Sequence, residues 1–116
     1  MAFAEYVRAK REALRAEDRR YSLRQVAQRI GVQPGYLSKV ERGDFAPPSE
    51  ETIRRLAGEI NEDVDVLLAM AGKVSKDLQE IIRARPALFA RLIRALGSAS
   101  DEQVEQLARE IRDGDW

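Results

Sequence analysis

The chain has 116 residues, with no cysteine and no histidine. It therefore lacks disulfide bonds, thiolate nucleophiles, imidazole bases and the usual zinc ligands, and we expect neither an enzyme nor a bound cofactor. Lysine and arginine number 20 and aspartate and glutamate number 20, but residues 1–42 hold ten basic and five acidic side chains, and residues 43–116 hold ten and fifteen. This division predicts that residues 1–42, which are net basic, face a polyanion and that residues 43–116, which are net acidic, face a different partner or surface.

The first predicted helix runs from Ala2 to about Ala16, and a loop is expected from Glu17 to Tyr21. Apolar side chains recur along the helix at helical spacing, among basic ones. They form one apolar face: Phe3, Tyr6, Val7, Ala13 and Leu14.

Two short helices joined by a tight turn are predicted next. Ser22 is suited to cap the first of them, and Gln25 can return a hydrogen bond to the backbone of Ser22, which makes a capping box. Gly31 ends this helix, because a residue that adopts positive φ suits a C-terminal cap. Pro34 suits the first turn of the second helix, which begins at about Gln33.

These two helices are expected to bury one side and expose the other. Val26, Ala27 and Ile30 form an apolar stripe on the first helix, and Leu37 and Val40 form one on the second. The opposite face of the second helix is polar and cationic, with Gly35, Ser38, Lys39 and Arg42.

This stretch resembles the helix-turn-helix of the lambda-repressor-like (Cro/CI, XRE) family. The resemblance covers about residues 3–70 and is densest at Ala27, Gly31, Leu37, Val40 and the terminal Glu41-Arg42-Gly43. It implies a five-helix domain that binds double-stranded DNA. It also implies an ion pair between an arginine of the first helix, Arg11, and the terminal glutamate, Glu41.

The resemblance further implies that the start and outward face of the second motif helix read bases: Gln33, Pro34, Gly35, Ser38 and Lys39. Pro34 and Gly35 depart from the glutamines of other members, so direct readout depends on Gln33 and Lys39. Leu23 also departs, since many members have a phosphate-binding glutamine there. Phosphate contact is then expected from backbone N–H groups and from Arg24, Tyr36, Ser38 and Arg42.

Two more helices complete the domain. Pro47 and Pro48 exclude a helix directly after the motif, and Ser49 caps the helix that follows. Asn61 is expected to end that helix and to cap the next. The two helices carry apolar stripes: Ile53, Leu56, Ala57, Ile60, Val64, Val66, Leu67, Leu68 and Met70. Like Met70, Phe45 is expected to pack rather than to contact a ligand.

The predicted DNA-binding domain spans residues 1–72, and residues 73–116 form an extension of about three short amphipathic helices. Pro86 begins the second of these and Gly97 ends it, and Ser100 and Gln103 make a capping box before the third. Their apolar side chains exceed what three short helices bury among themselves, which predicts a dimer interface. It comprises Leu88, Phe89, Leu92, Ile93, Leu96, Val104, Leu107 and Ile111.

The sequence therefore predicts an all-α protein with two possible functions. One is a transcriptional regulator, most simply a homodimeric repressor on an inverted-repeat operator. The other is the antitoxin of a toxin–antitoxin pair, whose C-terminal helices bind a second protein, the toxin, while the helix-turn-helix autoregulates the operon. The chain shows no signal peptide and no apolar run near the ~18 residues that a membrane span needs, so we expect a cytoplasmic protein with no membrane contact.

Overall fold

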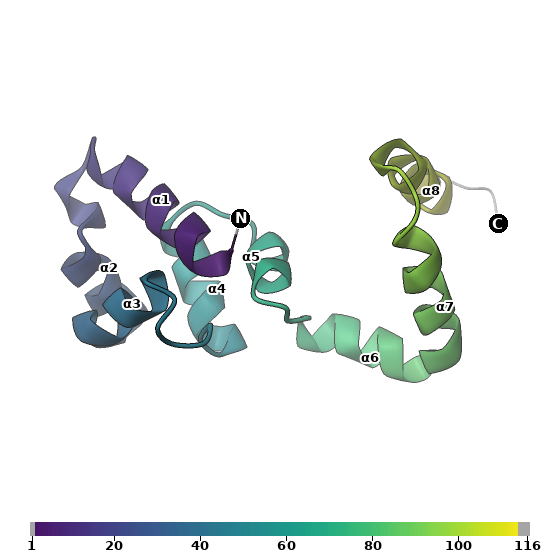
Figure 1. The fold of residues 1–116 in the computed structure, drawn as a ribbon, viewed down its shortest axis with the longest axis horizontal. Coiled ribbons are helices and arrows are strands. Elements are labelled where there is room, and N and C mark those ends of the chain that lie inside the picture. The colour runs from purple at the N-terminus through teal and green to yellow at the C-terminus, as the bar shows by residue number, and fades with distance from the viewer. Residues whose placement is uncertain (1, 114–116) are drawn as a thin grey trace. The chain divides into compact units, whose positions relative to one another are not determined.

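A computed structural model describes residues 2–113, and every regular element in that range is helical, which confirms the predicted all-α class (Figure 1). The chain divides into two compact units, Met1–Ser75 and Lys76–Trp116. The elements of the first unit are α1 (Phe3–Arg15), the 3₁₀ turn η1 (Arg19–Tyr21), α2 (Leu23–Ile30), α3 (Pro34–Glu41), α4 (Glu50–Glu59) and α5 (Val64–Met70). Those of the second unit are α6 (Lys76–Ala84), α7 (Pro86–Leu96) and α8 (Asp101–Asp113).

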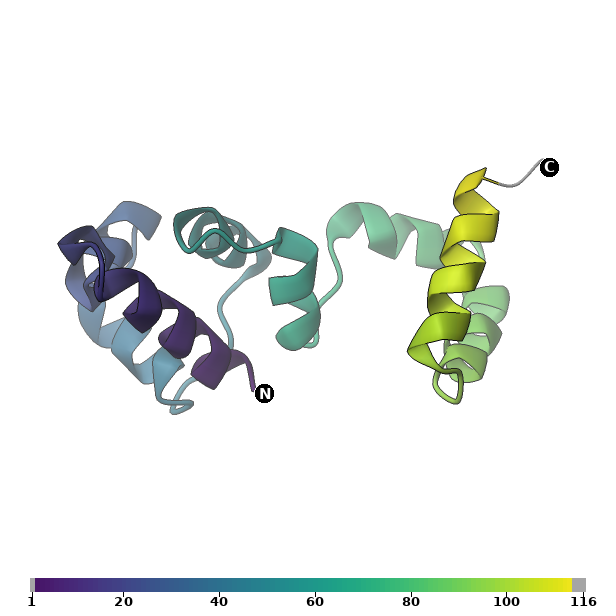
Figure 2. The same ribbon diagram turned by 90° about the horizontal axis from the view of Figure 1, so that it is seen from above.

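The first unit is built around one apolar core to which all five of its α-helices contribute. Helix α2 packs against both α3 and α4, while α1 packs on α3 and α4 packs on α5 (Figures 1 and 2). Because both motif helices are held on the core, the exposed face of α3 has a fixed position. The buried apolar side chains are Phe3, Val7, Val26, Ala27, Ile30, Leu37, Val40, Ile53, Leu56, Ala57, Ile60, Leu67 and Leu68.

Ser22 caps α2 as predicted, but only half of the capping box forms. Its hydroxyl accepts a hydrogen bond from the Gln25 N–H over 3.3 Å. The Ser22 N–H donates instead to the Arg19 carbonyl over 3.1 Å, because the segment predicted as a loop contains η1. The return bond from Gln25 is therefore a wrong prediction.

At the α4–α5 connection the predicted cap is also corrected. Asn61 does end α4, with a left-handed φ of 57°. The carboxylate of Asp63, however, accepts the N–H groups of Asp65 and Val66 at 2.8 and 3.2 Å. Asp63 has the extended backbone of an N-cap, whereas Asn61 has the left-handed conformation that closes a helix.

Two apolar side chains are exposed, one predicted on a core stripe (Val66) and one predicted to pack (Phe45). Val66 is 46% exposed and Phe45 is 45% exposed. The buried side of α5 is formed by Leu67 and Leu68, and at helical spacing Val66 falls outside it. Met70, by contrast, is partly buried against the core as predicted.

A hydrogen-bonded cluster ties α1 to the α4–α5 connection. The Tyr6 hydroxyl donates to Glu62 Oε2, and Lys10 Nζ donates to the same oxygen over 2.8 Å and to the Asn61 carbonyl over 3.1 Å. The Asp63 N–H donates to Glu62 Oε1 over 2.9 Å. These donors, Lys10 first, lower the pKa of Glu62 from 4.5 to about 2.

This shift predicts a specific loss of stability in acid. Unfolded Glu62 titrates near 4.5 and folded Glu62 near 2, so its contribution is complete above pH 4.5 and disappears as the pH falls to about 2. The unfolding midpoints of the unchanged protein and of Glu62→Gln should therefore differ at pH 6 and converge towards pH 2. Thermal unfolding across this range measures the effect, and a difference that stays constant with pH would contradict it.

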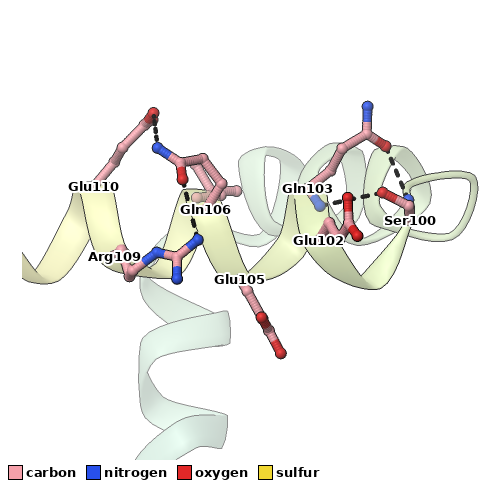
Figure 3. Close-up of a pocket in the computed structure, with 8 residues that line it drawn as sticks. Ser100, Glu102, Gln103, Glu105, Gln106, Arg109 and Glu110 are labelled. Atoms are coloured by element: carbon pink, nitrogen blue, oxygen red, sulfur yellow. Dashed lines mark hydrogen bonds between the residues drawn. The ribbon is translucent and has the colours of Figure 1, made fainter.

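In the second unit α6 packs against α7, yet no side chain that the structure describes there is buried. Pro86 begins α7 as predicted. Both bonds of the second capping box are present: the Ser100 N–H donates to Gln103 Oε1 over 2.8 Å, and the Gln103 N–H donates to Ser100 Oγ over 3.1 Å (Figure 3). None of the described helices is long and apolar enough to span a membrane. The exposed large apolar side chains of this unit are Leu78, Ile81, Leu88, Leu92, Ile93, Val104 and Ile111.

Candidate nucleic-acid interface

The turn between α2 and α3 depends on Gly31. Its φ of 78° lies in the left-handed region, where any side chain would be strained. The Gly31 N–H donates to the Gln28 carbonyl over 3.2 Å, and the Val32 N–H donates to the Ala27 carbonyl over 3.0 Å. These bonds satisfy the last carbonyls of α2 and turn the chain directly into α3.

The start of α3 presents polar groups that the fold does not use. Gln33 is the N-cap residue, but its side chain makes no cap hydrogen bond, and Pro34 occupies the first turn. The side-chain amide of Gln33 is thus free to bind a base edge, and the first N–H groups of α3 are free to bind an anion. A hollow beside this point is lined by Arg24, Gln28, Gly31, Val32, Gln33 and Pro34, so the fold brings Arg24 of α2 next to the start of α3.

The residues predicted to contact DNA share one surface along α3. Leu37 and Val40 face the core, while Gly35, Lys39 and Arg42 are exposed. Tyr36 and Ser38 are partly buried between these two sides. The outward face of α3 is thus the polar face predicted from the helical period.

The cations of this surface differ in how far they are neutralised. Arg42 Nε lies 3.4 Å from the carboxylate of Asp44, in an exposed pair. Arg24 and Lys39 make no ion pair within the described residues, 2–113. By contrast, Arg29 on α2 is paired with Glu59 at 2.6 Å. This surface therefore retains positive charge that the fold does not neutralise.

A buried ion pair fixes the end of α3 to α1. Arg11 Nε and Nη2 donate to the two carboxylate oxygens of Glu41 over 2.7 and 2.8 Å, and Arg11 Nη1 donates to the Tyr21 carbonyl over 3.1 Å. The two side chains are 4% and 3% exposed. The hydrogen bond to Glu41 raises the pKa of Arg11 above its usual value. The pair implied by the family resemblance is thus present in the structure.

The sequence did not predict one residue of this surface. Phe45, predicted to pack rather than to contact a ligand, lies against the outward face of α3, with its ring centroid 5.8 Å from that of Tyr36 and 5.0 Å from Lys39 Nζ. Phe45 is placed there because Gly43, with φ of 79°, turns the chain back along α3. The available signal was that Phe45 belongs to no helical repeat and stands two residues after a helix-ending glycine.

In a comparison with protein families, the model of a helix-turn-helix family matches residues 11–67. This range extends from Arg11 in α1 to Leu67 in α5 and includes the whole α2–turn–α3 unit. Comparisons with curated proteins and with solved structures find no match.

Proposed function

We propose that the chain acts as a homodimeric repressor on an inverted-repeat operator. The premise is that it belongs to the lambda-repressor-like (XRE) helix-turn-helix family and is a DNA-binding transcriptional regulator of that type. The dimer rests on one observation: the second unit has no buried side chain among its described residues and exposes apolar side chains on each of its helices. Chains in solution rarely leave such surface uncovered.

In this proposal α3 enters the major groove with its outward face against the base edges. Gln33, whose amide is not used as a cap, and Lys39, which carries an unpaired ammonium, supply the base contacts. Pro34 and Gly35 allow close approach. Phosphates are held by backbone N–H groups and by Arg24, Tyr36, Ser38 and Arg42.

The occupant proposed for the apolar surface is a second copy of the chain. On α7, Leu88 and Leu92 stand one turn apart along one edge of an apolar stripe and Ile93 lies on its other edge, while Phe89 and Leu96 are partly buried between them. On α8, Leu107, which is partly buried, and Ile111, which is exposed, stand one turn apart.

Charge also favours a second copy. Helix α7 carries Arg91 and Arg94 and no acidic residue. Helix α8 presents a polar surface that includes Glu102, Glu105 and Glu110 (Figure 3). In a two-fold dimer, α7 of one copy and α8 of the other are complementary in charge, and the symmetry forms each such contact twice.

Two joined modules are also what DNA binding requires. One helix-turn-helix reaches one half-site and makes few phosphate contacts, so specific binding at physiological salt normally needs a pair. Occlusion of a promoter requires only tight binding at a fixed site. Repression is therefore the simplest regulation that these two units could perform.

Selection from random duplexes, followed by footprinting and a promoter reporter, tests the proposal. We expect an inverted repeat with half-site centres about one helical turn, ~10 bp, or a simple multiple apart, and lower reporter output. A single unrepeated site bound by one chain would contradict it. A stable complex with a different protein through residues 76–116, in place of the homodimer, would instead support the antitoxin hypothesis.

Substitutions of Lys39 on α3 and of Arg42, the residue that caps the end of α3, separate base readout from phosphate contact. Lys39→Ala is expected to weaken operator binding by ~1–3 kcal/mol and to relax the preference at one base pair, because an ammonium that binds a base edge is lost. Arg42→Ala is expected to weaken all sequences evenly and to lower the salt dependence of binding. Binding of each variant to a set of operators varied one base pair at a time measures both effects. Arg54→Ala, at an exposed position of α4, is the control. An unchanged selected motif for Lys39→Ala would remove that side chain from base readout.

A further inference from the structure

Phe45 bridges two side chains of the DNA-facing surface although it lies outside α3. Its ring is tilted by 46° to that of Tyr36, with centroids 5.8 Å apart, and Lys39 Nζ lies 5.0 Å from the Phe45 centroid. The ring is 45% exposed, so burial in the core does not explain its position. The ammonium and the aromatic face attract each other through the ring quadrupole.

The main chain fixes this ring relative to Lys39. After the left-handed Gly43, the N–H groups of Asp44 and Phe45 both donate to the carbonyl oxygen of Lys39, over 2.9 and 3.3 Å. The residue that carries the ammonium therefore also anchors the backbone that carries the ring. The ring also packs on Tyr36, which is itself packed against the core.

An aromatic ring restrains a lysine side chain in a different way than a carboxylate does. An acidic partner would neutralise the charge and occupy ammonium donors, whereas an aromatic face takes part in no N–H···O bond. The acidic residues that follow Lys39 most closely in the sequence are engaged elsewhere, Glu41 by Arg11 and Asp44 by Arg42. Lys39 thus keeps its charge and donors for an external acceptor, while the ring limits the conformations that a flexible side chain would lose on binding.

We propose that Phe45 is a positioning residue that holds the Lys39 ammonium in place for base contact and thereby sharpens the preference at the base pair that Lys39 reads. The proposal rests on the proposed function, because it takes Lys39 as a base-reading residue. It assigns Phe45 no DNA contact of its own.

Three variants test this assignment on the full chain. Phe45→Leu keeps apolar bulk and removes the aromatic face, and it should reduce the preference at the Lys39 base pair by about two- to five-fold. Phe45→Tyr keeps the face and should retain the preference. In a Lys39→Ala background, Phe45→Leu should have no further effect on the preference or on the affinity. The salt dependence should be the same with and without Phe45→Leu, because no charge is changed.

A spectroscopic measurement tests the same contact without DNA. A ring beside an ammonium shifts the nuclear resonances of the neighbouring lysine methylene protons, so the Lys39 side chain should show a ring-current shift that Phe45→Leu removes and Phe45→Tyr keeps. Absence of this shift in the unchanged protein would overturn the proposal.

The other outcomes are also decisive. A Phe45→Leu effect that persists in the Lys39→Ala background, or that weakens all sequences evenly, would mean that Phe45 touches DNA itself, and it would overturn the positioning role. Failure of the premise that Lys39 reads a base is distinguishable, because Lys39→Ala alone would then leave the selected motif unchanged.

Discussion

Removal of residues 76–116 is expected to convert the dimer to a monomer and to weaken binding to the full operator by about 100- to 10,000-fold. Joined modules bind their second half-site at a high effective concentration, and a monomer loses that gain. The shortened chain should still fold, because every side chain that the structure describes as buried lies at or before Ser75. Its affinity for an isolated half-site should therefore match that of one module of the dimer.

Point variants test the same surface without deleting it. Leu92→Asp places a charge in the exposed apolar stripe of α7 and should lower the dimerisation constant. Ala87→Asp, at an exposed position of α7 outside the stripe, adds the same charge as a control and should have a smaller effect. Light scattering at micromolar concentration gives the oligomeric state. A monomeric full-length chain, or a chain ending at Ser75 that still dimerises and binds the whole operator tightly, would remove the role given to the second unit.

Separation of Arg11 from Glu41 should produce the largest loss of stability among single substitutions of charged residues. Both side chains are almost fully buried, so Arg11→Ala leaves an uncompensated carboxylate in the core at a cost of ~3–5 kcal/mol. The Tyr21 carbonyl also loses a donor. Because the pair ties α1 to the end of α3, operator affinity should fall along with stability.

A double-mutant cycle isolates this interaction. The free energies of unfolding of Arg11→Ala, Glu41→Ala and the double variant should give a coupling energy well above that of an exposed pair. Arg8 and Glu12, 3.2 Å apart on the exposed side of α1, provide that comparison and should couple by less than ~1 kcal/mol. Equal coupling in the two cycles would mean that burial adds nothing to the Arg11–Glu41 pair.

The features that the sequence predicted well are those decided by neighbouring residues. Ser22, Gly31 and Pro34 bound α2 and α3 because capping, a left-handed turn and a fixed φ are local properties. The helical period likewise separated Leu37 and Val40, which are buried, from Lys39, which is exposed. These choices need no information on the rest of the fold.

The features that the sequence did not predict depend on tertiary structure. Arg11 and Glu41 are 30 residues apart, and only the family resemblance paired them. The position of Phe45 follows from two N–H groups that converge on Lys39, which no periodicity reveals. The cap of α5 is Asp63 and not Asn61, because two polar residues two positions apart both suit the role, and the backbone conformation selects between them.

The side chain of Gln33 makes no cap hydrogen bond, and this has an evolutionary consequence. Ser22, Ser49 and Asp63 each cap a helix, so their loss costs ~1 kcal/mol of stability, whereas α3 begins without a side-chain cap. A substitution at position 33 therefore leaves the stability of the fold nearly unchanged while it alters the groups offered to DNA. After a gene duplication, two copies could separate their target sites by mutation at this position without first acquiring a stabilising change elsewhere.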